Sequence, residues 1–259
     1  MLGRKQNISN NDWLVAVAQI EQIISQKELD NAVDLVIAEI ISKTKGKRAA
    51  YAWSGGKDSL VLGHICEQAG IADSMLAVCD LEYPSFISWL QANKPAGCVV
   101  INTGQNLDWL AKHTEMLFPQ NSTVAGRWFA MVQHKAQRDY FQQNNLDILL
   151  LGRRRAEGNF VGRGDNLYTD RNGICRYSPL ADWSHEQILA YIHYHQLALP
   201  PIYAWKNGYL CGTHPWPARQ WTESIQNGWQ EIYDIDKDIV KAAAVKIASA
   251  RTFLREVQA

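Results

Sequence analysis

The residues best suited to binding or catalysis form one short polar run, Ser54-Gly55-Gly56-Lys57-Asp58-Ser59. An apolar segment ends at Trp53 just before it, and a helical pattern of apolar residues begins at Leu60. Two glycines permit a tight turn and close approach of the backbone to a ligand, and the amides at a helix start attract an anion. Lys57 adds a cation, and the two serines add hydroxyl donors. The run predicts a strand, a glycine loop and a helix that together hold phosphate.

The spacing of this loop differs from that of the two common nucleotide motifs. It fits neither Gly-x-x-x-x-Gly-Lys-Ser/Thr nor Gly-x-Gly-x-x-Gly. The alternative to a ligand site is a glycine-rich turn between a strand and a helix that binds nothing. The complete hexapeptide between an apolar strand and an amphipathic helix favours the phosphate site.

The elements that must position this loop follow from the apolar pattern of the flanking sequence. Strands are predicted near residues 49–53, 75–79, 98–102 and 147–151, and helices near 57–69, 84–92, 107–118 and 127–144. This alternation is typical of an α/β fold, a doubly wound and mainly parallel sheet. Ligands of such sheets lie beyond the carboxyl ends of the strands.

Helical segments are predicted on both sides of this core. Two helices are expected between residues 10 and 43, the first with an apolar face of Trp13, Val17, Ile20 and Ile24. A hairpin is expected at 167–177, turning at Asn172-Gly173, and a capping box at Ser184–Gln187 opens a helix. One closing helix is expected from the apolar face Ile239, Ala243, Ile247, Ala250 and Leu254. We therefore divide the chain into a helical segment 1–46, a nucleotide-binding domain 47–212 and a helical segment 213–259.

Composition limits the classes of function. The 259 residues are 47% hydrophobic and 20% charged with a formal net charge of zero, so no global basic field attracts nucleic acid or an anionic membrane. Five cysteines without a Cys-x-x-Cys pair favour a reducing compartment over a disulfide framework. No segment approaches the ~18 apolar residues of a membrane span, and the N-terminus lacks an apolar signal core. We expect a cytoplasmic protein with no membrane partner.

Four further segments match one family in order. They are Cys98–Gly104, Leu151–Glu157 with Arg163 downstream, Tyr177–Ser184 with its Ser-Pro-Leu-x-Asp-Trp-Ser pattern, and Asn207-Gly208-Tyr209. Together with the loop they resemble the phosphoadenosine phosphosulfate reductase family, in the superfamily of PP-loop ATP pyrophosphatases, the adenine nucleotide alpha hydrolases. The resemblance covers roughly residues 48 to 212. It implies a Rossmann-like sheet and an adenine nucleotide as ligand.

Two departures from the reductases change the expected chemistry. Reductases of this family carry a C-terminal cysteine, whereas this chain has none after Cys211. They also tend to lack the Lys and Asp of the loop, whereas Lys57 and Asp58 are present here. The resemblance therefore implies an ATP pyrophosphatase that transfers an adenylyl group, with Mg²⁺ as cofactor, in sulfur metabolism or sulfur modification of nucleic acid.

The resemblance also implies roles for individual residues. The backbone amides and hydroxyls of Ser54, Gly55, Gly56, Lys57 and Ser59 are expected to hold pyrophosphate. Lys57, Asp58 and Arg153 are the expected catalytic residues, with Asp58 as the magnesium ligand. The expected contacts to the adenosine are Trp53, Cys79, Asp80, Thr103 and Gly104. Gly152, Arg153, Arg154 and Arg163 are further expected nucleotide-binding residues, and Arg153, Arg154, Arg155 and Arg163 are the candidates to grip the second substrate's phosphate or sulfate.

Other interpretations remain open at this point. A reductase would need a cysteine thiolate, for which Cys211 is the candidate, although packing in the core is the simpler role for this thiol. A subunit that senses nucleotide without turnover is a third function. The acceptor is an oxyanion or a nucleic acid, and a sulfur-donor protein is an expected partner. His193 and His195 make a poor metal pair because residues two apart on a helix face different directions. The tryptophans 183, 205, 216, 221 and 229 fit core packing better than a base-stacking platform.

Overall fold

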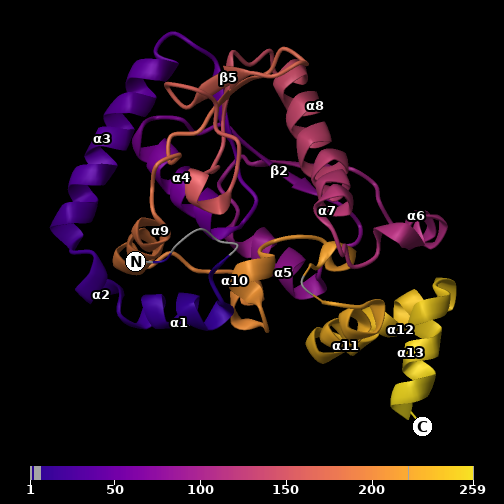
Figure 1. Ribbon diagram of the computed structural model, residues 1–259. Helices are drawn as coiled ribbons and strands as arrows, with labels where there is room; N and C mark the ends of the chain where they lie inside the picture. The colour runs from indigo at the N-terminus through magenta and orange to yellow at the C-terminus, as the bar shows by residue number, and fades with distance from the viewer. Residues whose placement is uncertain (1, 3–6, 221, 259) are drawn as a thin grey trace. The chain divides into compact units, whose positions relative to one another are not determined.

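The computed structural model describes residues 2, 7–220 and 222–258 (Figure 1). The chain forms two compact units. Unit 1 comprises Met1–Leu76, Ala92–Val100 and Gln137–Pro200, and unit 2 comprises Ala77–Gln91, Ile101–Ala136 and Pro201–Ala259. Each unit is therefore assembled from separate stretches of the sequence.

Six strands form one sheet in the order β3-β2-β1-β4-β6-β5. The strands are β1 (Ala49–Ala52), β2 (Ser74–Val78), β3 (Val99–Asn102), β4 (Ile148–Leu150), β5 (Leu167–Thr169) and β6 (Cys175–Tyr177). Strand β1 pairs in parallel with β2 and with β4, and β4 pairs in parallel with β6. Strand β5 is antiparallel to its neighbour β6. The predicted α/β class with a mainly parallel sheet is confirmed.

The order of the strands reverses at β1. From β1 the chain adds β2 and then β3 on one side, and it returns to place β4 on the other side. Residues of both central strands are fully buried, as expected for parallel strands covered on both faces: Ala50, Tyr51, Ile148, Leu149 and Leu150. In open α/β sheets, ligands bind where the strand order reverses, beyond the carboxyl ends of the two strands concerned. The segments that follow β1 and β4 are therefore the place to look for a site.

Figure 1 shows the helices of unit 1, with α4 lying among them. They are α1 (Asn10–Ala18), α2 (Ile20–Ile23), α3 (Gln26–Thr44), α4 (Lys57–Gln68), the greater part of α8 (Lys135–Gln143), and α9 (His185–Tyr194), with a 3₁₀ turn at Arg155–Glu157. Helices α3 and α9 pack on α4, and α1 and α2 pack on α9. The predicted capping box is confirmed: Ser184 caps α9 and the Gln187 side chain bonds back to its amide.

The expected N-terminal helix is interrupted. Its first piece ends at Ala18 and a second begins at Ile20, so the apolar positions no longer share one face. Trp13, Ile20 and Ile24 are buried as predicted, but Val17 is 39% exposed. The prediction of one continuous apolar face was wrong at Val17.

Unit 2 is mainly helical outside the two strand ends that it contains. Its helices are α5 (Pro84–Asn93), which runs on into unit 1, α6 (Leu107–Lys112), α7 (Ser122–Phe129), α10 (Gly208–Cys211), α11 (Ile225–Ile235), α12 (Lys237–Lys246) and α13 (Ala248–Gln258), with 3₁₀ turns at Thr114–Met116, Pro201–Ala204 and Trp216–Ala218 and a π-helical stretch at Ala130–His134. Helices α11, α12 and α13 pack on one another. The part of the chain that the structure describes has no helix both long and apolar enough to span a membrane.

Two helix predictions in unit 2 need correction. The helix expected at 107–118 ends at Lys112, and the helix expected from 127 begins at Ser122, where the Asn121 side chain accepts a hydrogen bond from the Val124 amide. The single closing helix is two helices, because Ile247 adopts an extended conformation with φ −112° and ψ 120°. The turn lets Phe253 fill the core where Leu254 was expected.

The predicted hairpin is confirmed. Strands β5 and β6 pair from Leu167 opposite Tyr177 to Thr169 opposite Cys175. The Asp170 carboxylate accepts hydrogen bonds from the amides of Asn172, at 2.8 Å, and Ile174, at 3.2 Å. Gly173 takes a φ of +78°, which glycine adopts without strain.

Candidate functional site

The loop between β1 and α4 has the predicted shape. Gly55 turns the chain with a φ of +69°. Gly56 is the N-cap residue of α4, so no side chain of the cap occupies the amides at the helix start. The Ser59 hydroxyl donates to the Gly56 carbonyl oxygen at 2.9 Å and accepts from the Ser54 amide at 3.0 Å. It also lies 3.1 Å from the Ser54 hydroxyl. Both serine hydroxyls therefore hold the loop closed on itself, while the helix start carries the positive end of the α4 dipole.

Two cations and two carboxylates alternate at the start of α4. Lys57 Nζ lies 2.8 Å from Asp58 Oδ2 and 2.6 Å from Glu157 Oε1. Arg154 Nε lies 2.6 Å from Asp58 Oδ1, and Arg154 Nη2 lies 3.2 Å from Glu157 Oε1. Lys57 is 3% exposed and Arg154 is fully buried. We call these four residues the charge network. Its formal charges cancel, which makes their burial tolerable.

Two aromatic side chains complete the surroundings of the charge network. His185, the first residue of α9, places Nδ1 3.2 Å from Arg154 Nη2. A guanidinium only donates, so this nitrogen accepts and the ring proton lies on Nε2. Burial, with the positive charge of Arg154, lowers the pKa of His185 to about 4, so the ring is neutral at pH 7. The Trp13 ring lies 5.0 Å from Lys57 Nζ and meets His185 edge-on, with centroids 4.5 Å apart.

Asp58 remains ionised in this setting. Burial alone would raise the pKa of its carboxyl, but the charges of Arg154 and Lys57 outweigh burial and hold the pKa below the usual value. Both carboxylate oxygens already accept from these cations. Within the described residues no group of three or more His, Cys, Asp or Glu side chains forms a metal site. A magnesium ion at Asp58 would therefore depend on phosphate and water oxygens for its other ligands, which is usual for Mg²⁺.

Gly152 brings the segment after β4 against the start of α4. A methyl group at Gly152 would lie 3.0 Å from both the carbonyl carbon and oxygen of Asp58 and 3.2 Å from the Ser59 amide. These are backbone atoms, which cannot swing aside as a flexible side chain can. A glycine at this position therefore permits Arg154, two residues later, to reach Asp58.

Replacing Gly152 with alanine is expected to destabilise the protein by about 1–3 kcal/mol, because the start of α4 must shift. Chemical denaturation measures this change in the free energy of unfolding. The matched control is Gly126→Ala in α7, where an added methyl group meets nothing within 4 Å. That variant should be neutral or stabilised by up to about 1 kcal/mol. Equal stability of both variants would show that the contact to Asp58 is not tight.

The predicted arginines are not gathered at one point. Arg153 Nη1 donates to the Tyr168 hydroxyl of the hairpin at 2.8 Å. Arg154 is in the charge network and fully buried, which the run of three neighbouring arginines alone does not indicate. Arg155 is exposed and pairs with Asp182, and Arg163 is exposed. Of the set expected to hold an anion, the structure brings Gly152 and Arg154 to the loop.

The residues expected to contact adenosine fall in both units. Trp53 belongs to unit 1, and its ring is 3% exposed. In unit 2, the Thr103 amide and hydroxyl both donate to the Val78 carbonyl oxygen, at 2.9 and 3.1 Å. Gly104 follows with a φ of +84°, and Asp80 Oδ1 accepts from the Asn102 side-chain amide at 2.5 Å. Cys79 is 3% exposed, and burial raises the pKa of its thiol. Contacts of these residues with adenosine stay a prediction.

The remaining candidates are packed against the protein or paired with a neighbouring side chain. Cys211 is 3% exposed, and its thiol donates to the Gln220 carbonyl oxygen at 3.5 Å. His193 pairs with Glu21, while His195 stacks on Tyr191. Three of the tryptophans are buried, namely Trp183, Trp216 and Trp229, and Trp205 packs against Tyr83. Trp221 lies outside the described residues.

Sequence reasoning missed three members of the site: Trp13, Glu157 and His185. His185 stands inside the capping-box sequence, where only the cap was recognised. Glu157 closes the Gly-Arg-Arg-Arg-Ala-Glu segment, and its carboxylate is an evident partner for a buried lysine. For Trp13, the sequence pattern indicated a place on an apolar helix face and nothing about a contact with Lys57.

Comparison with known proteins gives a consistent match. The family model described as the phosphoadenosine phosphosulfate reductase domain matches residues 48–210. A phosphoadenosine phosphosulfate reductase of Emericella nidulans is 33% identical over 85 residues, which are 33% of this chain and 27% of that protein. A phosphoadenosine 5'-phosphosulfate reductase of Vibrio campbellii is 20% identical over 241 residues, covering 89% of this chain and 88% of that protein. The structure of a phosphoadenylyl-sulfate reductase from Candida auris aligns with a TM-score of 0.49 and 14% identity, covering 69% of this chain and 91% of that one.

Proposed function

The chain belongs to the phosphoadenosine phosphosulfate reductase domain family of the PP-loop superfamily, and from this premise we propose that it is an ATP pyrophosphatase that transfers an adenylyl group. The observation that carries the proposal is the place of Lys57. This lysine starts α4 directly after the glycine turn, at the point where the strand order reverses. A cation and a helix N-terminus at that point are suited to the β- and γ-phosphates of ATP.

In the proposed reaction, an acceptor oxygen attacks the α-phosphorus of ATP and forms a new P–O bond. The bond between the α-phosphorus and the bridging oxygen to the β-phosphorus breaks, and its electron pair leaves with pyrophosphate. Lys57 and the amides at the start of α4 stabilise the charge that grows on this leaving group. When bound at Asp58, Mg²⁺ would neutralise further phosphate charge.

The charge network sets a condition on binding. Lys57 is already bonded to two carboxylates, so a triphosphate tail must compete with Asp58 and Glu157 for the same ammonium group. We expect Lys57 to exchange Glu157 for a phosphate oxygen. Arg154 then keeps Glu157 partly neutralised through its own contact of 3.2 Å.

The acceptor proposed for this enzyme is an oxyanion or a nucleic-acid oxygen, in sulfur metabolism or sulfur modification. Arg153 and the exposed Arg163 are the proposed contacts to its negative charge. A sulfur-donor protein is the proposed partner. The five cysteines are all free thiols, which fits a reducing compartment such as the cytoplasm.

Reduction of an adenosine sulfonucleotide is the less favoured function. It needs a reactive thiolate, and burial raises the pKa of Cys66, Cys79, Cys98 and Cys175. The remaining thiol, Cys211, is buried and hydrogen-bonded. Thioredoxin-dependent release of sulfite that disappears in Cys211→Ser would restore the reductase as the leading function.

The proposed function is tested by identifying the products of ATP. The protein is incubated with ATP, Mg²⁺ and cell extract, and the nucleotides are measured by mass spectrometry. Pyrophosphate together with AMP or an adenylylated product is expected. ADP with inorganic phosphate would contradict attack at the α-phosphorus. Tight ATP binding without any product would instead favour the nucleotide-sensing subunit.

A further inference from the structure

An exposed pair of aromatic rings is anchored next to the charge network. Phe160 and Tyr168 meet edge-on with ring centroids 4.8 Å apart, and Phe160 is 60% exposed. The Tyr168 hydroxyl accepts a hydrogen bond from Arg153 Nη1 at 2.8 Å. Arg153 directly precedes Arg154 of the charge network, and consecutive Cα atoms are about 3.8 Å apart. The aromatic pair is therefore close in the chain to the proposed phosphate site.

The loop that carries Phe160 is packed against strand β5. Gly162 has a φ of +95°, and a methyl group there would lie 3.0 Å from the Leu167 carbonyl oxygen and 3.3 Å from the Leu167 amide nitrogen. Glycine allows this conformation and this close approach of two backbones without strain. Tyr168 is the next residue of β5. Contacts of the backbone therefore fix the place where Phe160 faces solvent.

The surroundings of the aromatic pair are rich in positive charge. Residues 153–171 include five arginines and three acidic residues, in a chain whose formal net charge is zero. The carboxylates near the exposed arginines have cations of their own: Asp165 lies 3.4 Å from Lys43, Asp170 lies 3.1 Å from Arg176, and Asp182 pairs with Arg155. Among the described residues neither Arg163 nor Arg171 forms an ion pair, and residues 1, 3–6, 221 and 259 include no Asp or Glu. Their charges are available to an anion from solution.

Arg163 and Arg171 lie within reach of the two rings. Arg163 follows Phe160 by three residues, and Arg171 follows Tyr168 by three. Three residues span at most about 11 Å, and both arginine side chains are exposed. A guanidinium group forms strong hydrogen bonds to phosphate. We call Phe160, Tyr168, Arg163 and Arg171 the aromatic–arginine surface.

The combination of rings and arginines favours one class of ligand. Proteins that bind single-stranded nucleic acid stack bases on aromatic side chains and hold the backbone phosphates with cations. A duplex would offer its phosphates to the arginines, but its paired bases could not stack on Phe160. A small oxyanion such as sulfate would use the arginines and leave the rings without a role.

We propose that the aromatic–arginine surface binds single-stranded nucleic acid. A base stacks on Phe160, and Arg163 and Arg171 contact the neighbouring phosphates. All four residues belong to unit 1, which also contains the charge network. Binding at this surface is independent of turnover, whereas the role of the bound strand as the adenylyl acceptor rests on the proposed function.

Binding is tested without ATP, by fluorescence anisotropy of labelled oligouridylate and oligothymidylate of about 15 nucleotides. Saturable binding of at least one of them by the full-length protein is expected. An abasic strand of equal length keeps the phosphates and lacks the bases, and a duplex hides them, so both should bind more weakly. The proposal is overturned if neither single strand binds, or if the abasic strand or the duplex binds equally well.

Variants separate stacking from phosphate contact. Phe160→Ala should weaken binding at least about fivefold, while Phe160→Trp, which keeps an aromatic ring, should bind like the wild type. The double variant Arg163→Gln with Arg171→Gln should make the slope of log K against log salt shallower by about 1.4, since each phosphate contact to a single strand contributes about 0.7. An unchanged slope would contradict the assigned phosphate contacts.

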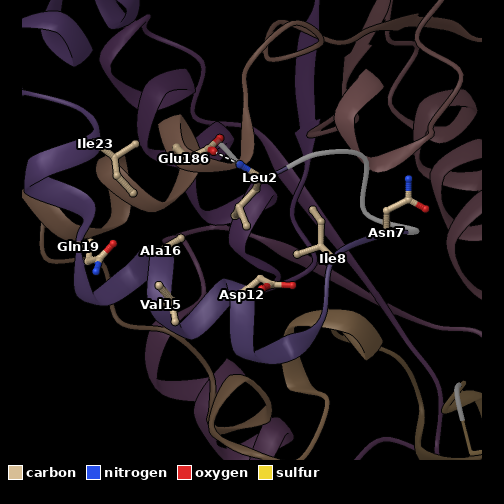
Figure 2. A pocket seen from close by; sticks show the side chains of 9 residues that line it. All are labelled: Leu2, Asn7, Ile8, Asp12, Val15, Ala16, Gln19, Ile23 and Glu186. Carbon is tan, nitrogen blue, oxygen red and sulfur yellow. Dashed lines mark hydrogen bonds between the residues drawn. The ribbon is translucent and has the colours of Figure 1, made fainter.

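The control for Phe160→Ala is Val15→Ala. Val15 is another exposed apolar residue of unit 1, 46% exposed, and it lines the cavity drawn in Figure 2 together with the carboxylates of Asp12 and Glu186. This variant should bind the strand like the wild type. Equal affinity of Phe160→Ala and Val15→Ala would show that Phe160 does not stack on a base.

The inference and the proposed function can fail separately. Release of pyrophosphate from ATP by a protein that binds neither single strand would overturn the aromatic–arginine surface and leave adenylyl transfer to an oxyanion. Binding that depends on Phe160, in a protein that forms no pyrophosphate, would support the surface and contradict the proposed function. An adenylylated oligonucleotide, detected by mass spectrometry and reduced in Phe160→Ala, would support both.

Discussion

Replacing Lys57 with alanine is expected to abolish release of pyrophosphate from ATP. Loss of a single group that stabilises transition-state charge typically lowers the rate on the order of 10²–10³-fold, and Lys57 carries a full charge. A pyrophosphate-release assay at saturating ATP measures the effect. An unchanged rate in Lys57→Ala would remove this lysine from the mechanism and with it the observation that carries the proposed function.

Because Lys57 is bonded to two carboxylates, its replacement needs a control for stability. Lys57 also neutralises the partly buried carboxylates of Asp58 and Glu157, so its loss alone can destabilise the fold. The double variant Lys57→Gln with Glu157→Gln removes one charge of each sign. It should melt close to the wild-type temperature and still release no pyrophosphate. Lys43→Gln, which removes another lysine of unit 1 with carboxylate partners, should retain full activity. Recovery of activity in the double variant would mean that Lys57 serves only to balance Glu157.

Replacing Arg154 with methionine is expected to lower the free energy of unfolding by about 3–5 kcal/mol. The guanidinium is fully buried, and it bonds to Asp58, to Glu157 and to the Trp183 carbonyl oxygen. Methionine fills a similar volume but leaves two carboxylates with Lys57 as their remaining cation within the charge network. Denaturant unfolding followed by circular dichroism measures the loss.

The adjacent arginine supplies the comparison for this experiment. Arg155 has a side chain that is 44% exposed, and its partner Asp182 is 69% exposed. Ion pairs at the surface contribute at most about 1 kcal/mol, so Arg155→Met should change stability by less than that amount. If Arg154→Met were no less stable than Arg155→Met, the charge network would not be a structural element of this protein.

The sheet and the loop could be predicted because their signals are local. The apolar strand before Ser54, the two glycines and the amphipathic helix after them lie together in the sequence. The capping box at Ser184 and the Asn172-Gly173 turn are likewise set by neighbouring residues. Each of these elements formed where it was predicted.

The charge network could not be predicted because its contacts join distant parts of the chain. Lys57 and Glu157 are 100 residues apart, and Asp58 and Arg154 are 96 apart. An arginine run has no periodic signal that separates the buried Arg154 from the two arginines beside it. The break at Ile247 was missed for a related reason, since residues on both sides of it keep the spacing of one helix.

The indole of Trp13 lies beside Lys57, yet it comes from a segment that precedes the residues matched by the family model, 48–210. The bounds of the family match and the bounds of the charge network with its surroundings therefore do not coincide. Homologues with the same core but a different opening helix would surround this ammonium group with other chemistry. A version trimmed to the shared core would lose the aromatic cover of its key cation, and its affinity for anions would not be that of the whole chain.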